Sequence, residues 1–462
     1  MTFRPHPIDL KLAAALPNGA LFAVGGRVRD ELRLPAAESF AVKDLDYVVT
    51  GVALEELRRL LESVGRVDLV GASFAVLKVT LDGHTVDVAL PRRERSTGVG
   101  HRDFDVQSGP DIPLADDLLR RDFRMNAIAR ALPSGELVDP YAGESDIRAK
   151  RVDILTERAF KEDPLRILRA GQFSARFGYR LTQRTKDAAI AAAELVHTVS
   201  PERVADELLK LFVHAPRPSA GLELLRETGV LSFIWPELLE GVGVEQNEWH
   251  AYDVYKHNLE TCDATPTGDP VLRIASLLHD VGKPRTKDGP HFYRHESVGA
   301  EMAREMLARL RFSNDIIHTV EQLVQHHMYS ADPELSDAAI RRFIRRIGLS
   351  RLEAQFALRA ADIAGSGLPK RDDSNERFQA RVWAEVARRP PFSIKDLAID
   401  GGDVIAAMVE HSLAPKGFRG DRRVGDALRA LFEQVTEEPE RNEPHTLRTL
   451  LAQYLDANFR VA

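Results

Sequence analysis

The stretch 21–50 constrains the fold of this chain most, because it joins a glycine turn to a pair of acidic residues. The four apolar residues before Gly25 and Gly26 predict a short strand that ends at this turn. Glycine has no Cβ atom, so the backbone can approach a bulky anion there. Asp44 and Asp46 stand two apart in a strand-like segment, which places both carboxylates on one face. Mg²⁺ and a nucleoside triphosphate require such a combination of phosphate turn and paired acids.

Each half of this pattern also has an ordinary explanation, because a glycine pair is usually a turn and Asp-x-Asp is usually a solvated strand end. In this order and at this spacing the two halves are much more specific. GGRVRD followed by KDLDYV resembles the first signature of the nucleotidyltransferase superfamily, in the branch of bacterial CCA-adding enzymes and poly(A) polymerases. The resemblance implies that Asp44 and Asp46 are catalytic and hold Mg²⁺. It also implies nucleotide binding by Gly25, Gly26, Arg27, Arg29 and Asp30.

The length and composition favour a large globular protein. A chain of 462 residues suggests about two to four domains, and 44% hydrophobic with 29% charged residues is typical of soluble proteins. Cys262 is the only cysteine, which excludes an internal disulfide and fits a reducing cytoplasm. The sequence shows neither a signal peptide nor an apolar run of membrane-spanning length. We therefore expect a cytoplasmic protein without a membrane partner.

The net charge of −7 argues against a generic basic nucleic-acid binder. It does not exclude RNA, because affinity depends on local patches. Arginine-dense segments occur at 92–95, 341–346 and 419–423, although such segments are more often solvated surface than RNA contacts.

Two features after the first acids leave alternatives open. Asp87 lies in the second of two predicted strands, 74–81 and 85–90, and is either a third acid facing the metals or a surface residue of an edge strand. The segment 91–113 has no clean periodicity and predicts a functional or mobile loop. In CCA-adding enzymes a flexible loop at this place is tied to addition of the final A. Because the segment has full length here, the resemblance leaves A addition available.

The segment 120–128, RRDFRMNAI, resembles the second signature of the family. Arginine forks bind triphosphate oxygens, and an Asp or Asn can hydrogen-bond ribose hydroxyls. The resemblance therefore implies nucleotide binding by Arg121, Asp122 and Asn126. The ordinary alternative is a helix start with Asp122 near its cap.

The segment EDPLRILRAGQFSARF opens a predicted helix, in which Asp163 and Arg166 are three apart and can share a face. The local alternative is a helix cap and a surface pair. The segment resembles the base-selecting motif of the family, which implies that Asp163 and Arg166 recognise the incoming base in place of a template. The resemblance also implies that Glu162, Arg169 and Arg176 support this pair or contact phosphate. Gln172 stands where many relatives carry arginine.

A second set of residues, between 247 and 365, indicates metal chemistry. Mixed His and Asp ligands suit one or two ions of Mn²⁺, Fe²⁺, Ni²⁺ or Mg²⁺. Their order resembles that of the HD phosphohydrolase superfamily, which implies a metal-activated water that attacks a phosphate ester. The alternative is a helical scaffold with a silent metal site. The predicted ligands are His257, His279, Asp280, His295, His326, His327 and Asp362.

Together these motifs predict an α+β protein: a nucleotidyltransferase head with a small mixed sheet, then mostly helical regions. We expect the head at 1–150, a helical neck with the base-selecting motif at 151–245, the HD domain at 246–370 and a helical tail at 371–462. The tail, with LAIDGGD at 397–403, resembles that of long CCA-adding enzymes, which would hold the tRNA elbow. Arg419, Arg422 and Arg423 would contact phosphate there.

The leading prediction is a tRNA nucleotidyltransferase that uses CTP, ATP and Mg²⁺ to build the 3′ CCA end, as a monomer or a dimer. Three alternatives remain. One is an enzyme that adds only A, and a second is a poly(A) polymerase, which usually carries a basic-aromatic motif where this chain has VGASF at 70–74. The third is an HD phosphohydrolase whose head only binds RNA; the acids Asp44 and Asp46 count against it.

Overall fold

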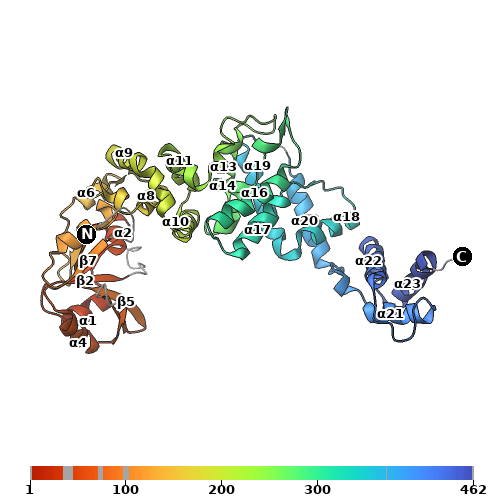
Figure 1. Ribbon diagram of the computed structural model, residues 1–462, viewed down its shortest axis with the longest axis horizontal. Coiled ribbons are helices and arrows are strands. Elements are labelled where there is room, and N and C mark those ends of the chain that lie inside the picture. The colour runs from red at the N-terminus through yellow and green to blue at the C-terminus, as the bar shows by residue number, and fades with distance from the viewer. Residues whose placement is uncertain (1–2, 35–44, 71–75, 97–103, 371, 460–462) are drawn as a thin grey trace.

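The computed structural model describes residues 3–34, 45–70, 76–96, 104–370 and 372–459. Its elements follow one another in an elongated arrangement, with the head at one end and the C-terminal tail at the other (Figure 1). The head combines a sheet with helices, and the later regions are mainly helical. The predicted α+β fold class is therefore confirmed.

One seven-stranded sheet organises the head, in the order β3-β4-β5-β2-β1-β8-β9. The neighbours β2 and β5 are parallel and the other paired strands are antiparallel, which makes the sheet mixed. The elements of the head are α1 (Pro7–Ala15), β1 (Leu21–Val24), α2 (Gly26–Arg33), β2 (Asp46–Val49), α4 (Leu54–Glu62), β3 (Arg66–Val70), β4 (Val76–Leu81), β5 (His84–Ala89), β6 (Arg92–Ser96), β7 (Phe104–Ser108), α5 (Leu114–Leu119), the 3₁₀ turn η1 (Arg124–Asn126), β8 (Ala129–Ala131), β9 (Leu137–Val138) and α6 (Gly143–Arg148).

The β4–β5 hairpin shows why the sequence forms this sheet. Leu77, Val79 and Leu81 are buried and alternate with exposed positions, as expected for a strand with one face on the core. Asp82 and Gly83 connect the strands with φ of 49° and 77°. Two consecutive positive φ values match the right-handed twist of a two-residue hairpin. The two strands predicted from the sequence in this region are therefore confirmed, and they pair as a hairpin.

Two parts of the head differ from the sequence-based expectations. The strand β3 was not predicted, because its residues are mostly exposed and show no alternation of burial; pairing with β4 holds it at the edge of the sheet. The predicted loop 91–113 contains the paired strands β6 and β7. Its lack of periodicity indicated a loop, although cross-strand backbone hydrogen bonds need no periodic apolar pattern.

The neck and the next region share one hydrophobic core. Arg273 joins them: it is completely buried, and its Nη1 donates to the carbonyl oxygens of Phe212 and Ala215, both at 2.7 Å, at the end of α10. These bonds satisfy carbonyls that a helix end leaves without partners. The neck contains β10 (Arg151–Val152), α7 (Ala159–Glu162), α8 (Leu165–Phe177), β11 (Arg180–Leu181), α9 (Gln183–Ala192), α10 (Pro201–His214), α11 (Pro218–Glu227), α12 (Leu231–Ile234) and α13 (Pro236–Leu239).

The third region is a bundle of helices, and the metal ligands predicted from the sequence lie at helix ends and on α14 and α19. Its elements are α14 (Val254–Ala264), α15 (Pro270–Leu278), β12 (Lys287–Asp288), β13 (His291–Phe292), α16 (His295–Arg309), α17 (Asn314–Gln325), α18 (Asp337–Ile347), α19 (Leu352–Gly365) and α20 (Ser374–Ala387).

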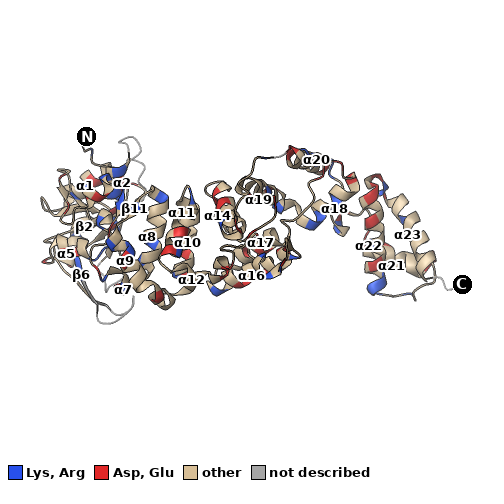
Figure 2. Ribbon diagram, turned by 90° about the horizontal axis from the view of Figure 1, so that it is seen from above, with Lys and Arg blue, Asp and Glu red and all other residues tan. Residues whose placement is uncertain are grey.

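The tail has its own small core, formed by α21 (Gly401–Glu410), α22 (Arg422–Glu437) and α23 (Pro444–Phe459). Buried Arg341 on α18 holds the end of α22, because its Nε donates to the carbonyl oxygen of Thr436 at 2.6 Å. Figure 2 shows basic residues at the start of α22, where the side chain of Arg422 is 91% exposed. No helix in the described ranges has the length and apolar character needed to cross a bilayer.

Candidate active site and metal centre

The glycine turn, an arginine and an acid converge in the head. Gly25 precedes α2 and has φ of 74° and ψ of −139°, a backbone conformation that residues with a Cβ atom avoid. A Cβ atom built on Gly25 would lie 2.9 Å from Nη1 of Arg121 and 3.8 Å from Oδ2 of Asp46. The backbone N–H groups at the start of α2 are therefore next to a cation and a carboxylate, as a phosphate and metal site requires.

The paired acids are only partly within the described residues. Asp44 lies outside them. Asp46 opens β2, is exposed, and pairs in register with Asp87 on β5. Residues paired across neighbouring strands point to the same sheet face, so Asp87 is next to Asp46, as the alternative of a third acid requires. The edge-strand alternative does not hold, because β5 lies between β4 and β2. Oδ1 of Asp87 also lies 3.6 Å from Nζ of Lys78.

Arg27 has a different environment from the other residues of its motif. Its guanidinium is buried, forms a two-pronged ion pair with Asp9 at 2.6 and 2.7 Å, and lies 3.2 Å from the hydroxyl of Tyr47. The Tyr47 hydroxyl in turn donates to Asp9 at 2.7 Å. These contacts fasten α1 to the sheet. The nucleotide-binding role predicted for Arg27 therefore finds no support in its contacts.

A chain of hydrogen bonds links the first signature to the second and to the neck. Nη1 of Arg29 donates to Oδ1 of Asn126 at 2.8 Å, and Nδ2 of Asn126 donates to Oδ1 of Asp122 at 2.8 Å. Nε and Nη2 of Arg169 donate to Oδ2 of Asp122 at 2.9 and 2.7 Å. Burial opposes the charge of Asp122, but Arg169 and Asn126 outweigh it and hold the pKa of this carboxyl below its usual value.

The region around Asp122 is a turn rather than a capped helix start. The arginines of the motif follow α5, and Asp122 precedes the short turn η1. Arg121 is 3.4 Å from Asp117, and burial lowers its pKa despite that partner. In this turn Arg121 faces Gly25, whereas the adjacent Asp122 faces Arg169.

The base-selecting pair predicted from the sequence has mixed surroundings. Oδ1 of Asp163 accepts from the backbone N–H of Leu165, the first residue of α8, at 3.3 Å, and Oδ2 lies 3.4 Å from Arg203 on α10. The N-cap of α8 is Pro164 rather than Asp163. Nη2 of Arg166 donates to the carbonyl oxygen of Arg120 at 2.7 Å. Arg166 thus connects α8 to the arginine segment of the head.

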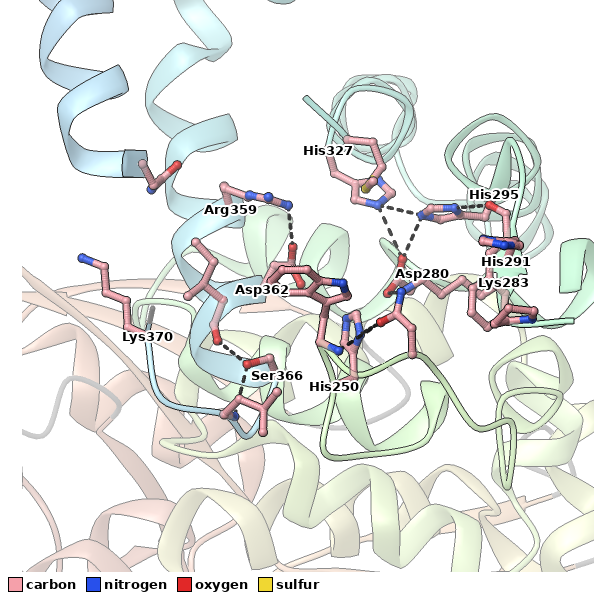
Figure 3. A pocket seen from close by; sticks show the side chains of 18 of the residues that line it. His250, Asp280, Lys283, His291, His295, His327, Arg359, Asp362, Ser366 and Lys370 are labelled. Carbon is pink, nitrogen blue, oxygen red and sulfur yellow. Dashed lines mark hydrogen bonds and ion pairs between the residues drawn. The ribbon is translucent and has the colours of Figure 1, made fainter. Parts of the chain in front are cut away.

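The second set of residues converges on one carboxylate, Asp280, just after α15. Figure 3 shows His295 and His327 beside it. Its Oδ2 lies 3.4 Å from Nε2 of His257 and 3.3 Å from Nε2 of His279. Its Oδ1 lies 3.3 Å from Nε2 of His295 and 3.4 Å from Nε2 of His327. The two oxygens therefore face two separate histidine pairs.

The donor set fits divalent metal. In each of the four rings Nδ1 meets a backbone carbonyl oxygen, which orients the ring and leaves Nε2 toward the centre. Oδ1 of Asp280 is buried and has no hydrogen-bond partner among the described residues, as expected for an oxygen that binds a cation. Asp362 adds a carboxylate 3.2 Å from Nε2 of His257. The ring contacts are His257 with Gly365 at 3.1 Å, His279 with Ser276 at 2.8 Å, His295 with Phe292 at 2.7 Å and His327 with Val324 at 2.7 Å.

His326 is the one predicted ligand of the HD site that the structure does not bring into a candidate metal group among the described residues. His327 joins the cluster, whereas His326 is absent from the described groups of metal-ligating atoms. Consecutive residues at a helix end point about 100° apart, so one of two adjacent histidines faces the centre. Burial, together with Arg346 and Arg351, lowers the pKa of His326.

His250 is a residue that sequence reasoning missed. Its ring packs edge-to-face on His257 with centroids 4.6 Å apart, and its nitrogen lies within 4.8 Å of ligand atoms of His257 and Asp362. Burial lowers the pKa of His250 to about 3, so the ring is neutral and able to bind metal. The signal available in the sequence was its place seven residues before His257.

A cavity of about 620 Å³ opens over this centre (Figure 3). Cations flank the acids: Nζ of Lys283 is 2.5 Å from Asp280, and Nη1 of Arg359 is 3.1 Å from Asp362. Trp249 and Tyr293 also line the cavity, and both are at least half exposed. The cavity can therefore accept an anionic group next to the cluster.

Three family models match the chain in order. They are the poly A polymerase head domain at 21–153, the probable RNA and SrmB-binding site of polymerase A at 178–241, and the HD domain at 250–383. The multifunctional CCA protein of Cupriavidus necator is 34% identical over 408 residues, which is 84% of this chain and 93% of the relative. That of Nitrosococcus oceani is 35% identical over 389 residues, or 80% and 92% of the two chains.

Solved structures show the same fold. The CCA-adding enzyme of Bacillus stearothermophilus in complex with CTP has a TM-score of 0.63 at 21% identity, over 95% of this chain and 93% of that one. The Thermotoga maritima CCA-adding enzyme complexed with tRNA has a TM-score of 0.54 at 19% identity, over 98% and 97%. The order of elements, the motifs and the curated relatives agree, so the resemblance seen in the sequence is confirmed: the chain belongs to the family of multifunctional CCA proteins, which are CCA-adding nucleotidyltransferases with an HD domain.

Proposed function

We propose that the head transfers C and A residues from CTP and ATP to the 3′ end of tRNA. The observation that carries the proposal is the meeting of Gly25, Arg121 and Asp46 within 4 Å of one point in the head of a CCA-adding family member. In this reaction the terminal 3′ oxygen attacks the α-phosphorus, and pyrophosphate leaves. Neither a poly(A) polymerase nor an HD phosphohydrolase with an inactive head is favoured by the relatives.

Asp46, together with Asp44, would hold Mg²⁺. Asp46 fits this role because its carboxylate is exposed and stands beside Asp87 on one sheet face. Bound Mg²⁺ supplies charge that favours ionisation of the 3′ hydroxyl and neutralises the triphosphate. Asp87 would support the metal site from β5.

The other residues of the head position the nucleotide. The backbone at Gly25 and Gly26 approaches the phosphates, and Arg121 offers a guanidinium beside that turn. Asn126 and Asp122 would meet the ribose, because both belong to the hydrogen-bonded chain that starts at Arg29. Asp30 holds Arg29 through an ion pair at 2.8 Å.

Asp163 and Arg166 would choose the base. Arg166 stands at the joint of head and neck, because its Nη2 donates to the carbonyl oxygen of Arg120. Asp163 lies three residues before it and is held within the neck by Arg203. An acceptor and a donor held there can read the Watson–Crick edge of C or A. Arg169 orients Asp122 and so sets the distance between base and ribose contacts.

The HD domain would be a phosphohydrolase that uses one or two divalent cations. One cation would be held by His257, His279 and Asp362, and a second by His295 and His327, with Asp280 shared between them. A bound metal supplies an activated water for attack on a phosphate ester. His250 would complete the first set.

One experiment tests the head. The protein is incubated with tRNA lacking CCA, tRNA ending in C and tRNA ending in CC, each with labelled CTP or ATP. If the enzyme completes CCA, labelled C should be incorporated into tRNA lacking CCA and into tRNA ending in C, and labelled A into tRNA ending in CC. Incorporation of A alone would support an A-adding enzyme, and long A tails on unrelated RNA would support a polymerase. Asp46→Asn should abolish incorporation, whereas Asp68→Asn on the exposed strand β3 is the matched control.

A second experiment tests the HD site. Hydrolysis of a chromogenic phosphomonoester is measured with Mn²⁺ or Ni²⁺ for the wild type, His327→Ala and His326→Ala. The proposal predicts that His327→Ala loses hydrolysis of the phosphomonoester, because His327 belongs to the cluster. His326→Ala should hydrolyse it at a rate near that of the wild type. Equal rates in all three proteins would contradict a catalytic HD site and favour a silent scaffold.

A further inference from the structure

Three arginines gather around one aromatic side chain at the joint of head and neck. The guanidinium carbons of Arg29, Arg33 and Arg176 lie 4.8, 4.4 and 5.2 Å from the ring centre of Phe177. Phe177 is stacked on Phe173, with centroids 5.6 Å apart and the planes inclined by 11°. Figures 1 and 2 both place α2, which carries two of these arginines, beside α8. The ring pair thus holds three guanidinium groups near one another.

The cluster has more positive than negative charge. Asp30 pairs with Arg29 at 2.8 Å and with Arg33 at 3.3 Å. Arg176 forms no ion pair with a carboxylate in the part of the chain that the structure describes. Burial, followed by the charge of Arg29, lowers the pKa of Arg176. Three guanidinium groups around one carboxylate repel one another, and binding of an added anion would reduce this repulsion.

The cluster is connected to the nucleotide site but extends beyond it. Arg29 touches both, since its Nη1 donates to Asn126 while its guanidinium covers Phe177. Arg176 lies ten residues after Arg166 on α8, or about 15 Å along the helix axis at 1.5 Å per residue. A phosphate bound there is separated from the base edge that Arg166 would read.

We infer that Arg33 and Arg176, which both contact the ring of Phe177, bind a phosphate group of the substrates, and this inference rests on the proposed nucleotidyl transfer. Guanidinium forks suit phosphate oxygens, and Arg33 has a quarter of its side chain exposed to receive one. The phosphate has two sources with the same chemistry: the backbone of the tRNA 3′ strand and the triphosphate of the incoming nucleotide. The proposed function already gives the triphosphate its own binding groups, the Gly25–Gly26 turn and Arg121, so the inference assigns this cluster to the tRNA backbone.

The test measures both substrates in Arg33→Gln, Arg176→Gln and the double variant. The Kd for tRNA ending in CC should rise about 3- to 10-fold per substitution, with an unchanged KM for ATP. The slope of log Kd against log salt should fall by about one for each arginine–phosphate ion pair that a substitution removes. Arg58→Gln is the control, because Arg58 is exposed on α4 and pairs with Glu62 at 3.0 Å. Arg176→Lys keeps the charge and should recover part of the affinity.

Each outcome has a defined meaning. A higher KM for ATP with unchanged tRNA binding would assign the phosphate site to the triphosphate. Unchanged affinities for both substrates, in variants whose Tm equals that of the wild type, would overturn the inference. Absence of incorporation by the wild-type chain would instead contradict the proposed function, and tRNA binding measured without turnover would still decide the inference.

Discussion

Arg169 on α8 donates two hydrogen bonds to Oδ2 of Asp122 in the head, from Nε at 2.9 Å and from Nη2 at 2.7 Å. The third nitrogen of the guanidinium lies 3.3 Å from Glu207 on α10. One side chain therefore ties the second nucleotide motif to two neck helices. Asp163 and Arg166 stand just before Arg169 on the same segment. The distance between the ribose contacts and the base contacts therefore depends on the hydrogen bonds between Arg169 and Asp122.

Arg169→Gln should weaken both activity and stability. It removes a charged partner from Asp122 and Glu207, whose residues are at least nine-tenths buried, and an unsatisfied buried charge-assisted hydrogen bond costs about 1–3 kcal/mol. We expect incorporation on tRNA ending in CC to fall roughly 10-fold or more, as misplaced contacts in an active site do. Urea unfolding and single-turnover incorporation measure the two effects.

Lys210→Gln is the matched control for that substitution. Lys210 binds the same Glu207 at 2.7 Å, but half of its side chain is exposed. If Lys210→Gln lost as much activity and stability as Arg169→Gln, the contacts of Glu207, rather than the hydrogen bonds of Arg169 to Asp122, would determine how the head and the neck are joined.

Acidification should weaken the joint through Asp122. The pKa of this carboxyl is lowered from 3.8 in the folded protein, so its contribution to stability is present above that value. The contribution is lost as the pH falls through the lower, folded pKa. The free energy of unfolding of Asp122→Asn should therefore differ from that of the wild type by a constant amount between pH 5 and 7. The difference should shrink below about pH 4. A difference that stays constant down to pH 3 would contradict the ion pair.

Gly25→Ala should raise the KM for CTP and ATP. Both φ of 74° and the Cβ position 2.9 Å from Nη1 of Arg121 are unfavourable, so the arginine must move. Gly51→Ala is a close control, because Gly51 has φ of 73° but nothing within 4 Å of its added Cβ. Both variants should lose about 1 kcal/mol of stability. Nucleotide KM values that change equally in both would assign the effect to backbone strain alone.

The sequence predicted the elements whose local pattern carries the information. The apolar–polar alternation of VLKVTL predicts the strand β4, and Asp82-Gly83 is a typical turn pair; the structure shows the matching burial and positive φ values. The glycine turn at Gly25 follows from the backbone freedom of glycine. The strand β3 could not be predicted in this way, since its residues are mostly exposed and its partner strand fixes it. The β6–β7 pairing likewise depends on backbone bonds across the segment expected to be a loop.

The same limit applies to individual site residues. Arg27 and Arg29 differ by about 200° around α2, so one enters the core with Asp9 while the other meets Asn126. His326 and His327 diverge in the same manner. A motif gives the residue types and the spacing, whereas the helix phase decides which side chain reaches the site.

Asp280→Asn should abolish binding of a second metal ion and weaken that of the first. Both carboxylate oxygens face histidine pairs, and an amide nitrogen in place of one oxygen cannot act as a ligand. Metal content after dialysis against Mn²⁺ or Ni²⁺ should fall from as many as two equivalents to one or none. Incorporation by the head should be unchanged, because its own acids lie on β2 and β5. Asp288→Asn, on the exposed strand β12, is the control and should keep the wild-type metal content. Equal metal content in Asp280→Asn and wild type would contradict a shared carboxylate, because no other described acid faces both histidine pairs.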